Sequence, residues 1–515
     1  MLCVLRVLAV LLLALVFVPH GTTFAGTTFV VTRTDDPGDG VCDGSCTLRE
    51  AIDAANSSGG SDVIAFNIPG SPPFTIQPGS PLPEIIDPVT IDGTTQPGFD
   101  GAPIIELNGE SAGNGVSGLA ITAGNSTVRG LVIDRFSDNG ILIMHTGGNV
   151  VQGNFIGTDV TGTTPLSNGG SGVVIAGAAS NNLIGGTEPG ARNLISGNAG
   201  AGVSLWDAGT TGNTIQGNFI GTDVTGTATL GNAGIGVALY DGAANNQVGG
   251  TEAGAGNLIS GNSRAGVVMV SPGTNENRVQ ENLIGTSISG TASLGNAEGG
   301  VAIADSASGN QVGGTEPGDR NLISGNAGHG VAIADPGTTS NRIQGNFIGT
   351  DPTGTLALGN GLTGVVVTND ATGNSILSNS IRSNGGLGID LGDDGVTAND
   401  ARDRDSGPNG LQNFPVLSPP FRFHGVLSVG GVLASKPNST YRVELFGVAE
   451  CDASGNGEGE VYLGFKDVTT GPSGGTTFLF QLPPDFPPDH FVTATATDAA
   501  GSTSEFSRCA GPTVP

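Results

Sequence analysis

A 64-residue internal repeat is the feature that most constrains the fold of this chain. The segment Asn-Phe-Ile-Gly-Thr-Asp, with Leu and Ser replacing Phe and Asp in its third copy, starts at Asn154, Asn218, Asn282 and Asn346. The segment NLISGN returns at the same spacing, starting at Asn193, Asn257 and Asn321. Self-similarity at a fixed period is typical of architectures in which each repeat stacks only on its neighbours.

A shorter unit lies inside the long repeat. The pattern Gly-Val/Ile-x-apolar starts at Gly140, Gly172, Gly202, Gly236, Gly266, Gly300, Gly330 and Gly364. The unit from Gly202 holds three short segments, GVSLW, NTIQG and NFIGT, in which apolar and polar residues alternate with the period of a strand. Turn-forming Gly, Asn, Asp and Thr residues separate them. Three strands per unit predict an all-β fold, a right-handed parallel β-helix of about ten coils, whose stacked coils share one apolar core.

Composition and spacing weigh against other folds. Glycine occurs 90 times among 515 residues, and charged residues make up only 12% of the chain. Long surface helices normally carry many charged residues, so an all-α fold is disfavoured. A β-propeller blade has four strands in about 40–50 residues, which fits the shorter repeat poorly. A calcium-binding nonapeptide roll needs GGxGxD, which is absent.

Asparagine recurs between the expected strands. It follows Gln-Gly at Asn218 and Asn346, and Ser-Gly at Asn198, Asn262 and Asn326. Asparagine tolerates the left-handed conformation that a sharp corner requires. We expect these side chains to stack and to hydrogen-bond along the helix axis.

The first 25 residues predict a signal peptide. Arg6 precedes an apolar run over residues 7–18, and small residues lead to a cleavage site near Ala25. The run is short for a membrane span, and no second hydrophobic stretch follows, so we expect no transmembrane segment. Four cysteines remain after cleavage, which in an exported chain favours two disulfides, Cys42–Cys46 and Cys451–Cys509. A zinc site is the alternative for these cysteines.

The net charge of −28 limits the partners. It argues against nucleic acid and against anionic membrane surfaces. Cations and neutral polymers remain compatible with it. We expect a monomer.

The two ends of the repeat region predict covering structures. Residues 26–117 are expected to hold an N-terminal cap and the first coils, because Thr47-Leu-Arg-Glu50 is a capping box that starts a helix. Residues 118–413 then form the main β-helix, with 392–408 as a linker. Residues 414–515 contain TYRVELF, TTFLFQL and FVTATAT, which alternate like sandwich strands and predict a separately folding Ig-like module.

The cap motif also carries a family resemblance. CTLREAI (Cys46–Ile52) resembles the motif of the CSLREA domain, which precedes right-handed β-helix repeats in exported bacterial proteins. IDGTTQPGF (Ile91–Phe99), the GNFIGTD repeats and the C-terminal segments resemble the same proteins. The resemblance implies a pectin-lyase-like fold but no reaction, because this fold serves lyases, hydrolases, epimerases, esterases and adhesins alike.

No catalytic constellation is visible in the sequence. Polysaccharide lyases of this fold need a Lys or Arg base beside calcium-binding carboxylates, whereas the repeat region has no Lys and its arginines fall mostly in turns. Gly328-His329-Gly330 is similar to the Gly-His-Gly of polygalacturonases, but the matching Asp-Asp and Arg-Ile-Lys are missing. We therefore expect His329 to be a surface turn residue and assign no catalytic residue.

Alignment of the short units exposes two candidate columns. The first holds Asp207, Asp241, Asp305 and Asp335, which neighbouring coils would bring together in pairs. Two such carboxylates could share Ca²⁺, or they could simply be turn residues in contact with water. The second column holds Trp206 and Tyr240, which alternation directs outward. This aromatic pair could be a sugar-binding platform beside Asp207 and Asp241, or a stacking contact that stabilises neighbouring coils.

The sequence thus favours an exported, cell-surface or extracellular β-helix protein that binds a glycan or a matrix without catalysis. A polysaccharide lyase or glycoside hydrolase on the same fold is the alternative. Calcium is the one cofactor that the carboxylate column suggests.

Overall fold

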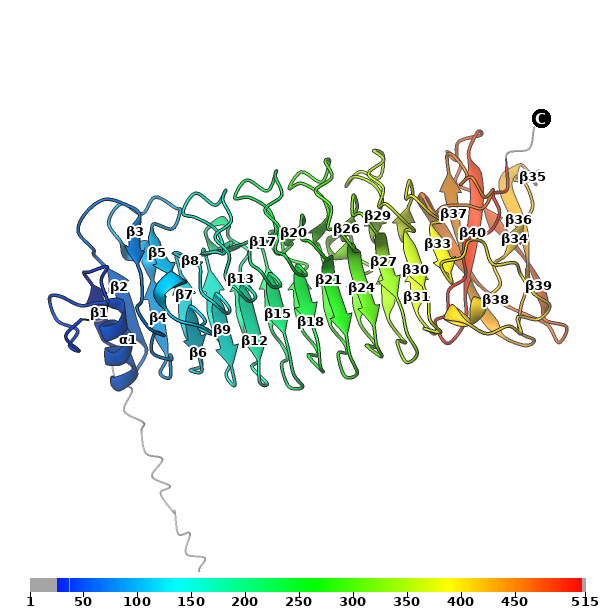
Figure 1. The fold of residues 1–515 in the computed structure, drawn as a ribbon. Helices are drawn as coiled ribbons and strands as arrows, with labels where there is room; N and C mark the ends of the chain where they lie inside the picture. Colours follow the sequence, from blue (N-terminus) through cyan, green and yellow to red (C-terminus); the bar gives the residue numbers. More distant parts are fainter. Residues whose placement is uncertain (1–25, 37, 512–515) are drawn as a thin grey trace, which may run out of the picture.

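The computed structural model describes residues 26–36 and 38–511. The predicted signal peptide lies outside the described residues. The chain forms a rod of three parallel sheets, with a helical cap at one end and antiparallel sheets at the other (Figure 1). This confirms the predicted all-β parallel β-helix.

Each complete coil contributes one strand to each sheet, and the strands pair in the order in which the coils follow one another. Sheet I contains β1 (Thr28–Val31), β2 (Asp62–Phe66), β4 (Val89–Asp92), β7 (Thr127–Arg129), β10 (Val150–Gln152), β13 (Leu183–Gly185), β16 (Thr214–Gln216), β19 (Gln247–Gly249), β22 (Arg278–Gln280), β25 (Gln311–Gly313), β28 (Arg342–Gln344) and β31 (Ser375–Leu377). Sheet II contains β3 (Phe74–Ile76), β5 (Ile105–Asn108), β8 (Leu131–Asp134), β11 (Phe155–Ile156), β14 (Leu194–Ile195), β17 (Phe219–Ile220), β20 (Leu258–Ile259), β23 (Leu283–Ile284), β26 (Leu322–Ile323), β29 (Phe347–Ile348) and β32 (Ser380–Ile381). Sheet III contains β6 (Leu119–Ile121), β9 (Ile141–Met144), β12 (Val173–Ala176), β15 (Val203–Leu205), β18 (Val237–Leu239), β21 (Ala265–Val270), β24 (Gly299–Ala304), β27 (His329–Ile333), β30 (Val365–Val367) and β33 (Ile389–Leu391).

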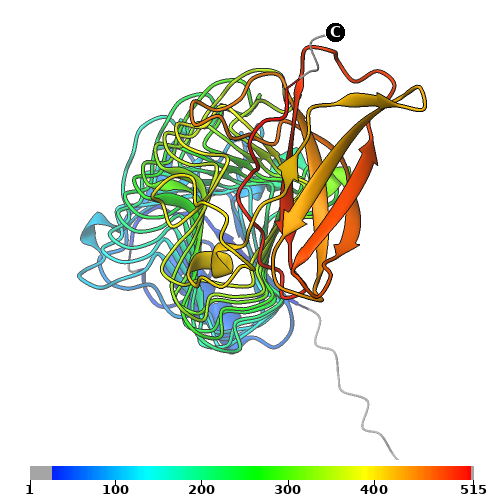
Figure 2. The same cartoon turned by 90° about the vertical axis from the view of Figure 1, so that its right-hand side faces the viewer.

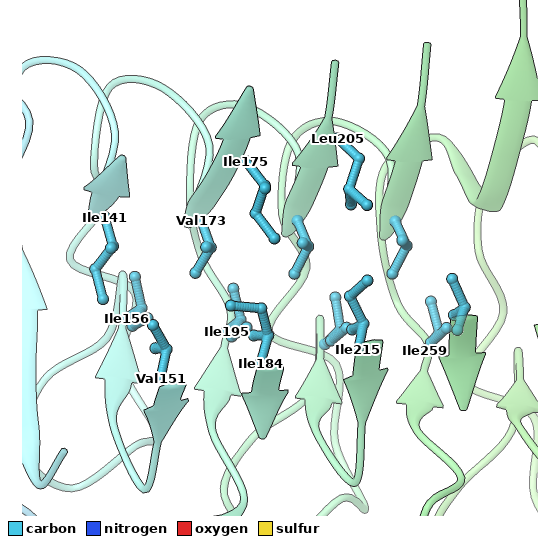
Figure 3. Close-up of a cluster of buried hydrophobic side chains, with 14 of the residues drawn as sticks. Ile141, Val151, Ile156, Val173, Ile175, Ile184, Ile195, Leu205, Ile215 and Ile259 are labelled. Carbon is cyan, nitrogen blue, oxygen red and sulfur yellow. The ribbon is translucent and has the colours of Figure 1, made fainter. Parts of the chain in front are cut away.

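The interior of the rod is one continuous aliphatic core. Figure 3 shows Ile175 from sheet III, Ile184 from sheet I and Ile195 from sheet II directed toward one another. All three are fully buried, as are their equivalents in the coils before and after. A single coil cannot bury these faces, so the core exists only because the coils stack.

Steric crowding explains why each short unit starts with glycine. A Cβ atom on Gly202 would lie 2.5 Å from Ile220 Cγ2, and one on Gly236 would lie 2.4 Å from Ile259 Cγ2. The residue after each glycine, Val203 or Val237, is itself fully buried in the core. Two consecutive positions thus face the interior at this corner, and the first of them has room only for a hydrogen atom.

Buried asparagines form a ladder at each of the three corners. Each Nδ2 donates to Oδ1 of the asparagine in the next coil, over 2.9–3.2 Å. The corner between sheets I and II holds Asn154, Asn193, Asn218, Asn257, Asn282, Asn321, Asn346 and Asn379. The corner between sheets II and III holds Asn168, Asn198, Asn232, Asn262, Asn296, Asn326, Asn360 and Asn384. The predicted stacking is confirmed, and the third ladder, from Asn149 to Asn374 between sheets III and I, is an addition.

The N-terminal end is covered by helix α1 (Leu48–Ser57). Thr47 and Glu50 form the predicted capping box. Leu48 and Ile52 are buried in the same core as the first coils, beside Cys46, which is disulfide-bonded to Cys42 as predicted. The amphipathic helix therefore covers apolar surface that the first coil would otherwise expose.

The C-terminal end is covered by two antiparallel sheets (Figure 2). One contains β34 (Val416–Leu417), β35 (Phe421–Phe423), β36 (Val426–Ala434) and β39 (Gly475–Gln481); the other contains β37 (Thr440–Val448), β38 (Val461–Thr469) and β40 (Phe491–Thr497). They share their own apolar cluster, and the predicted Cys451–Cys509 disulfide is present. The Ig-like assignment and the domain boundaries stay predictions. No helix in the described part of the chain is long and apolar enough to cross a membrane.

Candidate functional site

The predicted aromatic pair lies at the ends of two neighbouring strands of sheet III. Trp206 follows β15 and Tyr240 follows β18, and the register pairs Leu205 with Leu239. Leu205 and Leu239 are fully buried in the core. Because successive side chains alternate across a strand, Trp206 and Tyr240 are directed to the outer face, as predicted.

The two rings contact each other on this outer face. Their centroids are 6.4 Å apart with an interplanar angle of 65°, an edge-to-face arrangement. Trp206 is 43% exposed, whereas Tyr240 is half-buried. Burial raises the pKa of the Tyr240 hydroxyl above its ordinary value. The pair therefore presents a partly exposed indole ring in contact with a half-buried tyrosine.

A shallow groove of about 320 Å³ continues from Tyr240 along the outer face of sheet III. Small and aliphatic side chains of successive strands form its floor: Ala265 and Val268 from β21, Ala302 from β24 and Ala332 from β27. The groove runs across the strands, parallel to the rod axis. An elongated, mainly apolar depression of this kind fits a linear ligand with weakly polar faces.

Polar side chains line the edge of the groove. Arg264 Nε donates to Glu298 Oε1 over 3.0 Å, and both side chains are more than half exposed. An exposed ion pair contributes little to stability. It does place a donor and an acceptor group beside Tyr240 and the apolar floor, where hydroxyl groups of a ligand could reach them.

His329 lies in this groove, so its assignment to a surface turn is wrong. It is the first residue of β27 and pairs in register with Gly299 of β24. Its side chain is half-buried, Nδ1 is buried without a hydrogen-bond partner among the described residues, and Nε2 lies 4.0 Å from Asp393 Oδ2. Burial lowers the pKa of His329, although nearby Asp393 and Asp390 oppose the change. The glycines on both sides of His329 resemble a turn in the sequence. Gly330, however, is one of the glycines that start a short unit, where the core has room only for a hydrogen atom.

The predicted carboxylate column consists of turn residues in left-handed conformation. Asp207, Asp241, Asp305 and Asp335 have φ between +50° and +77°. Asp207 Oδ2 accepts a hydrogen bond from Gly177 N at 3.0 Å, and Asp335 Oδ1 accepts one from Asn369 Nδ2 at 3.1 Å. In the described residues this column gathers no group of three metal ligands, whereas Ca²⁺ takes 6–8 oxygens. Calcium at these carboxylates stays a prediction.

A different acidic group lies where the sequence predicted only a linker. Oxygens of Asp400, Asp403 and Asp405 lie within 4.8 Å of one another. Asp403 already accepts hydrogen bonds from Asn413 N and Ser435 Oγ, and Lys436 Nζ lies 3.6 Å from it. In the sequence, the close spacing of the three aspartates is the signal that could have indicated this cluster. The hydrogen bonds of Asp403 tie the linker to the C-terminal region.

Comparisons with known proteins give similarity to solved structures only. No protein-family model and no curated protein sequence matches this chain. The solved structures include full-length tailspike protein 2 of Escherichia coli O157:H7 bacteriophage CAB120, with 10% identity, 94% of this chain and 68% of that chain covered, and a TM-score of 0.34. A mannuronan C-5 epimerase module of Azotobacter vinelandii has 16% identity, 68% and 94% coverage and a TM-score of 0.36. An alginate lyase of Paenibacillus sp. str. FPU-7 has 14% identity, 72% and 99% coverage and a TM-score of 0.30. The CSLREA resemblance stays a prediction, and the function proposed below rests on this chain's own residues.

Proposed function

We propose that this chain is an exported, extracellular protein that binds a linear glycan along the outer face of sheet III without chemical change. The observation that carries the proposal is the exposed Trp206 ring in edge-to-face contact with Tyr240, which itself lines a groove that follows the rod axis. The two disulfides fit an oxidising, extracellular location.

The chemistry of the face matches that of a sugar chain. Pyranose rings have apolar faces that pack on aromatic rings and hydroxyl edges that need hydrogen-bond partners. Trp206 offers such a ring, and Arg264 and Glu298 offer donors and acceptors farther along the groove. Repetition of the coil gives the face the extended form that a polymer can follow across several strands.

The test is retention in affinity gels that contain a panel of neutral and acidic polysaccharides. The Trp206→Ala variant should lose retention by at least about tenfold while its free energy of unfolding changes by at most ~1–2 kcal/mol, as expected for a surface pair. Phe465→Ala is the matched control, because Phe465 is an exposed aromatic residue on the C-terminal sheets. Undiminished retention of the Trp206→Ala variant would contradict the proposal.

A second candidate function is cleavage of the bound glycan, the lyase or hydrolase alternative. The observation that favours it is the position of His329 in the same groove as Tyr240, with Asp393 at 4.0 Å. Incubation with the same panel should then release new reducing or unsaturated ends. His329→Ala should abolish that release and leave retention intact. Retention without product supports binding alone.

A further inference from the structure

A hollow of about 480 Å³ lies on the outer face of sheet II, on a different sheet from the aromatic pair. Its floor is formed by Leu258, Leu283, Leu322 and Phe347, from four successive strands. It lies at the second of the three NLISGN segments, which starts at Asn257, and at the segment from Asn282 that follows it; this part of the repeat is called the middle copy. Comparison with the copies before and after shows what opens it.

The first difference is the loss of an arginine. Arg192 and Arg320 occupy equivalent positions in the flanking copies, and each guanidinium stacks 4.1 Å from the centroid of a phenylalanine, Phe219 or Phe347. Each Nε also donates to a glycine carbonyl of the next coil. The middle copy has Gly256 in place of the arginine and Leu283 in place of the phenylalanine. The two smaller residues leave the space that the stacked pair fills elsewhere.

The second difference is the gain of a carboxylate at the same place. The glycines that accept those arginine bonds, Gly217 and Gly345, have φ of +69°, and the middle copy has Glu281 instead, with φ of +60°. A left-handed backbone disfavours a side chain that has a Cβ atom. Glu281 lies directly beside Gly256, since a Cβ atom built on Gly256 would be 3.5 Å from Glu281 Cγ. The glutamate side chain thus lies next to the position that carries an arginine in the flanking copies.

One oxygen of the Glu281 carboxylate is not used by the fold. Its Oε2 is buried and has no hydrogen-bond partner among the described residues. Burial raises the pKa of Glu281 above its ordinary value. A buried polar oxygen without a partner costs free energy. The smaller residues Gly256 and Leu283 thus open the space above the apolar floor, and Glu281 places an unpaired acceptor oxygen beside it.

We propose that this hollow is a second carbohydrate subsite, which takes a neutral pyranose unit of an oligosaccharide. The apolar floor contacts one face of the ring, and Glu281 accepts hydrogen bonds from ring hydroxyls. Arg320 on the rim supplies N–H donors. A single carboxylate beside an arginine and four apolar side chains does not offer the oxygen ligands that a divalent cation requires. The subsite is independent of the function proposed for sheet III.

The test is saturation-transfer NMR with cellohexaose, mannohexaose and mannuronate hexamer as probes. It uses the Trp206→Ala variant, so that failure of this proposal is distinguishable from failure of the sheet III site. We expect a neutral hexaose to receive saturation and the mannuronate hexamer to receive less, because its carboxylates meet Glu281.

Restoring the flanking sequence should close the subsite. Adding Gly256→Arg and Glu281→Gly should weaken binding of the neutral hexaose by about tenfold or more, since a hydrogen bond to a charged group and the space are both lost. A Cβ atom at position 256 would lie 2.1 Å from the carbonyl oxygen of residue 281, so the backbone must shift toward the arrangement of the flanking copies, and thermal melting checks that the double variant is folded. Gly190→Arg, at a position with open space around it, is the matched control. Unchanged binding after the double substitution, or no saturation of either neutral hexaose, would overturn the proposal.

Discussion

At the scale of single residues, the buried asparagines have the strictest hydrogen-bonding requirements. Asn262 Nδ2 donates to Asn296 Oδ1 at 3.0 Å and to the carbonyl of Ile220 at 3.2 Å. Its Oδ1 accepts from Asn232, through both the side-chain and the backbone nitrogen. Every polar atom of the amide is therefore paired inside the protein. A corner turn buries backbone groups that the sheets cannot pair, and the ladder satisfies them.

Replacing one ladder residue should be costly. Asn262→Ala leaves the buried backbone N–H of Asn232 without a partner and removes the side-chain hydrogen bonds to Ile220, Asn232 and Asn296, so we expect the free energy of unfolding to fall by about 2–4 kcal/mol. Denaturant unfolding followed by circular dichroism measures this change. Asn114→Ala, which removes an exposed asparagine, should change it by less than about 0.5 kcal/mol. A similar small effect at both positions would mean that the ladder is not needed for stability.

At the scale of elements, the strands of sheet III are positioned by the glycine that precedes each of them. The kink at this glycine sends two consecutive residues inward and then restores the alternation that directs Trp206 and Tyr240 outward. The same kink directs His329, one residue before Gly330, to the outer face. The site on sheet III thus depends on a backbone feature that the core enforces.

A methyl group at the kink should disturb this arrangement. Gly236→Ala would place Cβ 2.4 Å from Ile259 Cγ2 and 2.6 Å from the carbonyl oxygen of Gly266. We expect a loss of about 1–3 kcal/mol, typical of overpacking, together with weaker glycan retention as Tyr240 shifts. Thermal melting and affinity gels measure the two effects. Gly44→Ala, which meets no atom within 4 Å, should leave both unchanged. If Gly236→Ala also left both unchanged, the corner would be less tightly packed than described.

At the scale of the whole molecule, both ends of the rod are closed by packing. Phe446 and Phe506 of the C-terminal region belong to the same apolar core as Ile381 and Ile389 of the last coils. Glu505 accepts hydrogen bonds from the backbone nitrogens of Leu391 and Thr397. The C-terminal region thus also covers the apolar end of the rod, and its folding as a separate module stays a prediction.

This docking should depend on pH. Burial raises the pKa of Glu505 from 4.5 to about 7. A folded pKa above the unfolded value means that the contribution to stability is complete below pH ~4.5 and is lost as pH rises through about 7. It amounts to at most about 3 kcal/mol, at 1.36 kcal/mol per pKa unit. Thermal melting should therefore show lower stability at pH 8.5 than at pH 5.

Substitution of Glu505 isolates its contribution to the pH dependence of stability. Glu505→Gln cannot ionise and should reduce the loss of stability between pH 5 and pH 8.5. Glu188→Gln, which changes an exposed glutamate, should leave that loss as in the unsubstituted protein. An equal pH dependence in all three proteins would show that Glu505 does not control docking.

The sequence by itself determined the fold and the outward position of the aromatic pair. Both follow from periodicity: the repeat defines the coil, and alternation within a strand decides which side chains enter the core. The helix of the N-terminal cap was also visible, because the capping box Thr47–Glu50 is a local pattern. The two disulfides followed from the even cysteine count and from the placement of the cysteines, two in the N-terminal cap and two in the C-terminal region.

Only the tertiary structure determines which residues of different coils lie side by side. His329 looks like a turn residue locally, and only the register with Gly299 puts it in the groove with Tyr240. Gly256 and Glu281 are 25 residues apart in the sequence, and their side-by-side position depends on where the chain passes in the next coil. The docking of Phe506 on the last coil likewise joins segments far apart in the chain. A periodic pattern specifies which way a side chain points, whereas its neighbours depend on loop lengths and stacking, which no local pattern encodes.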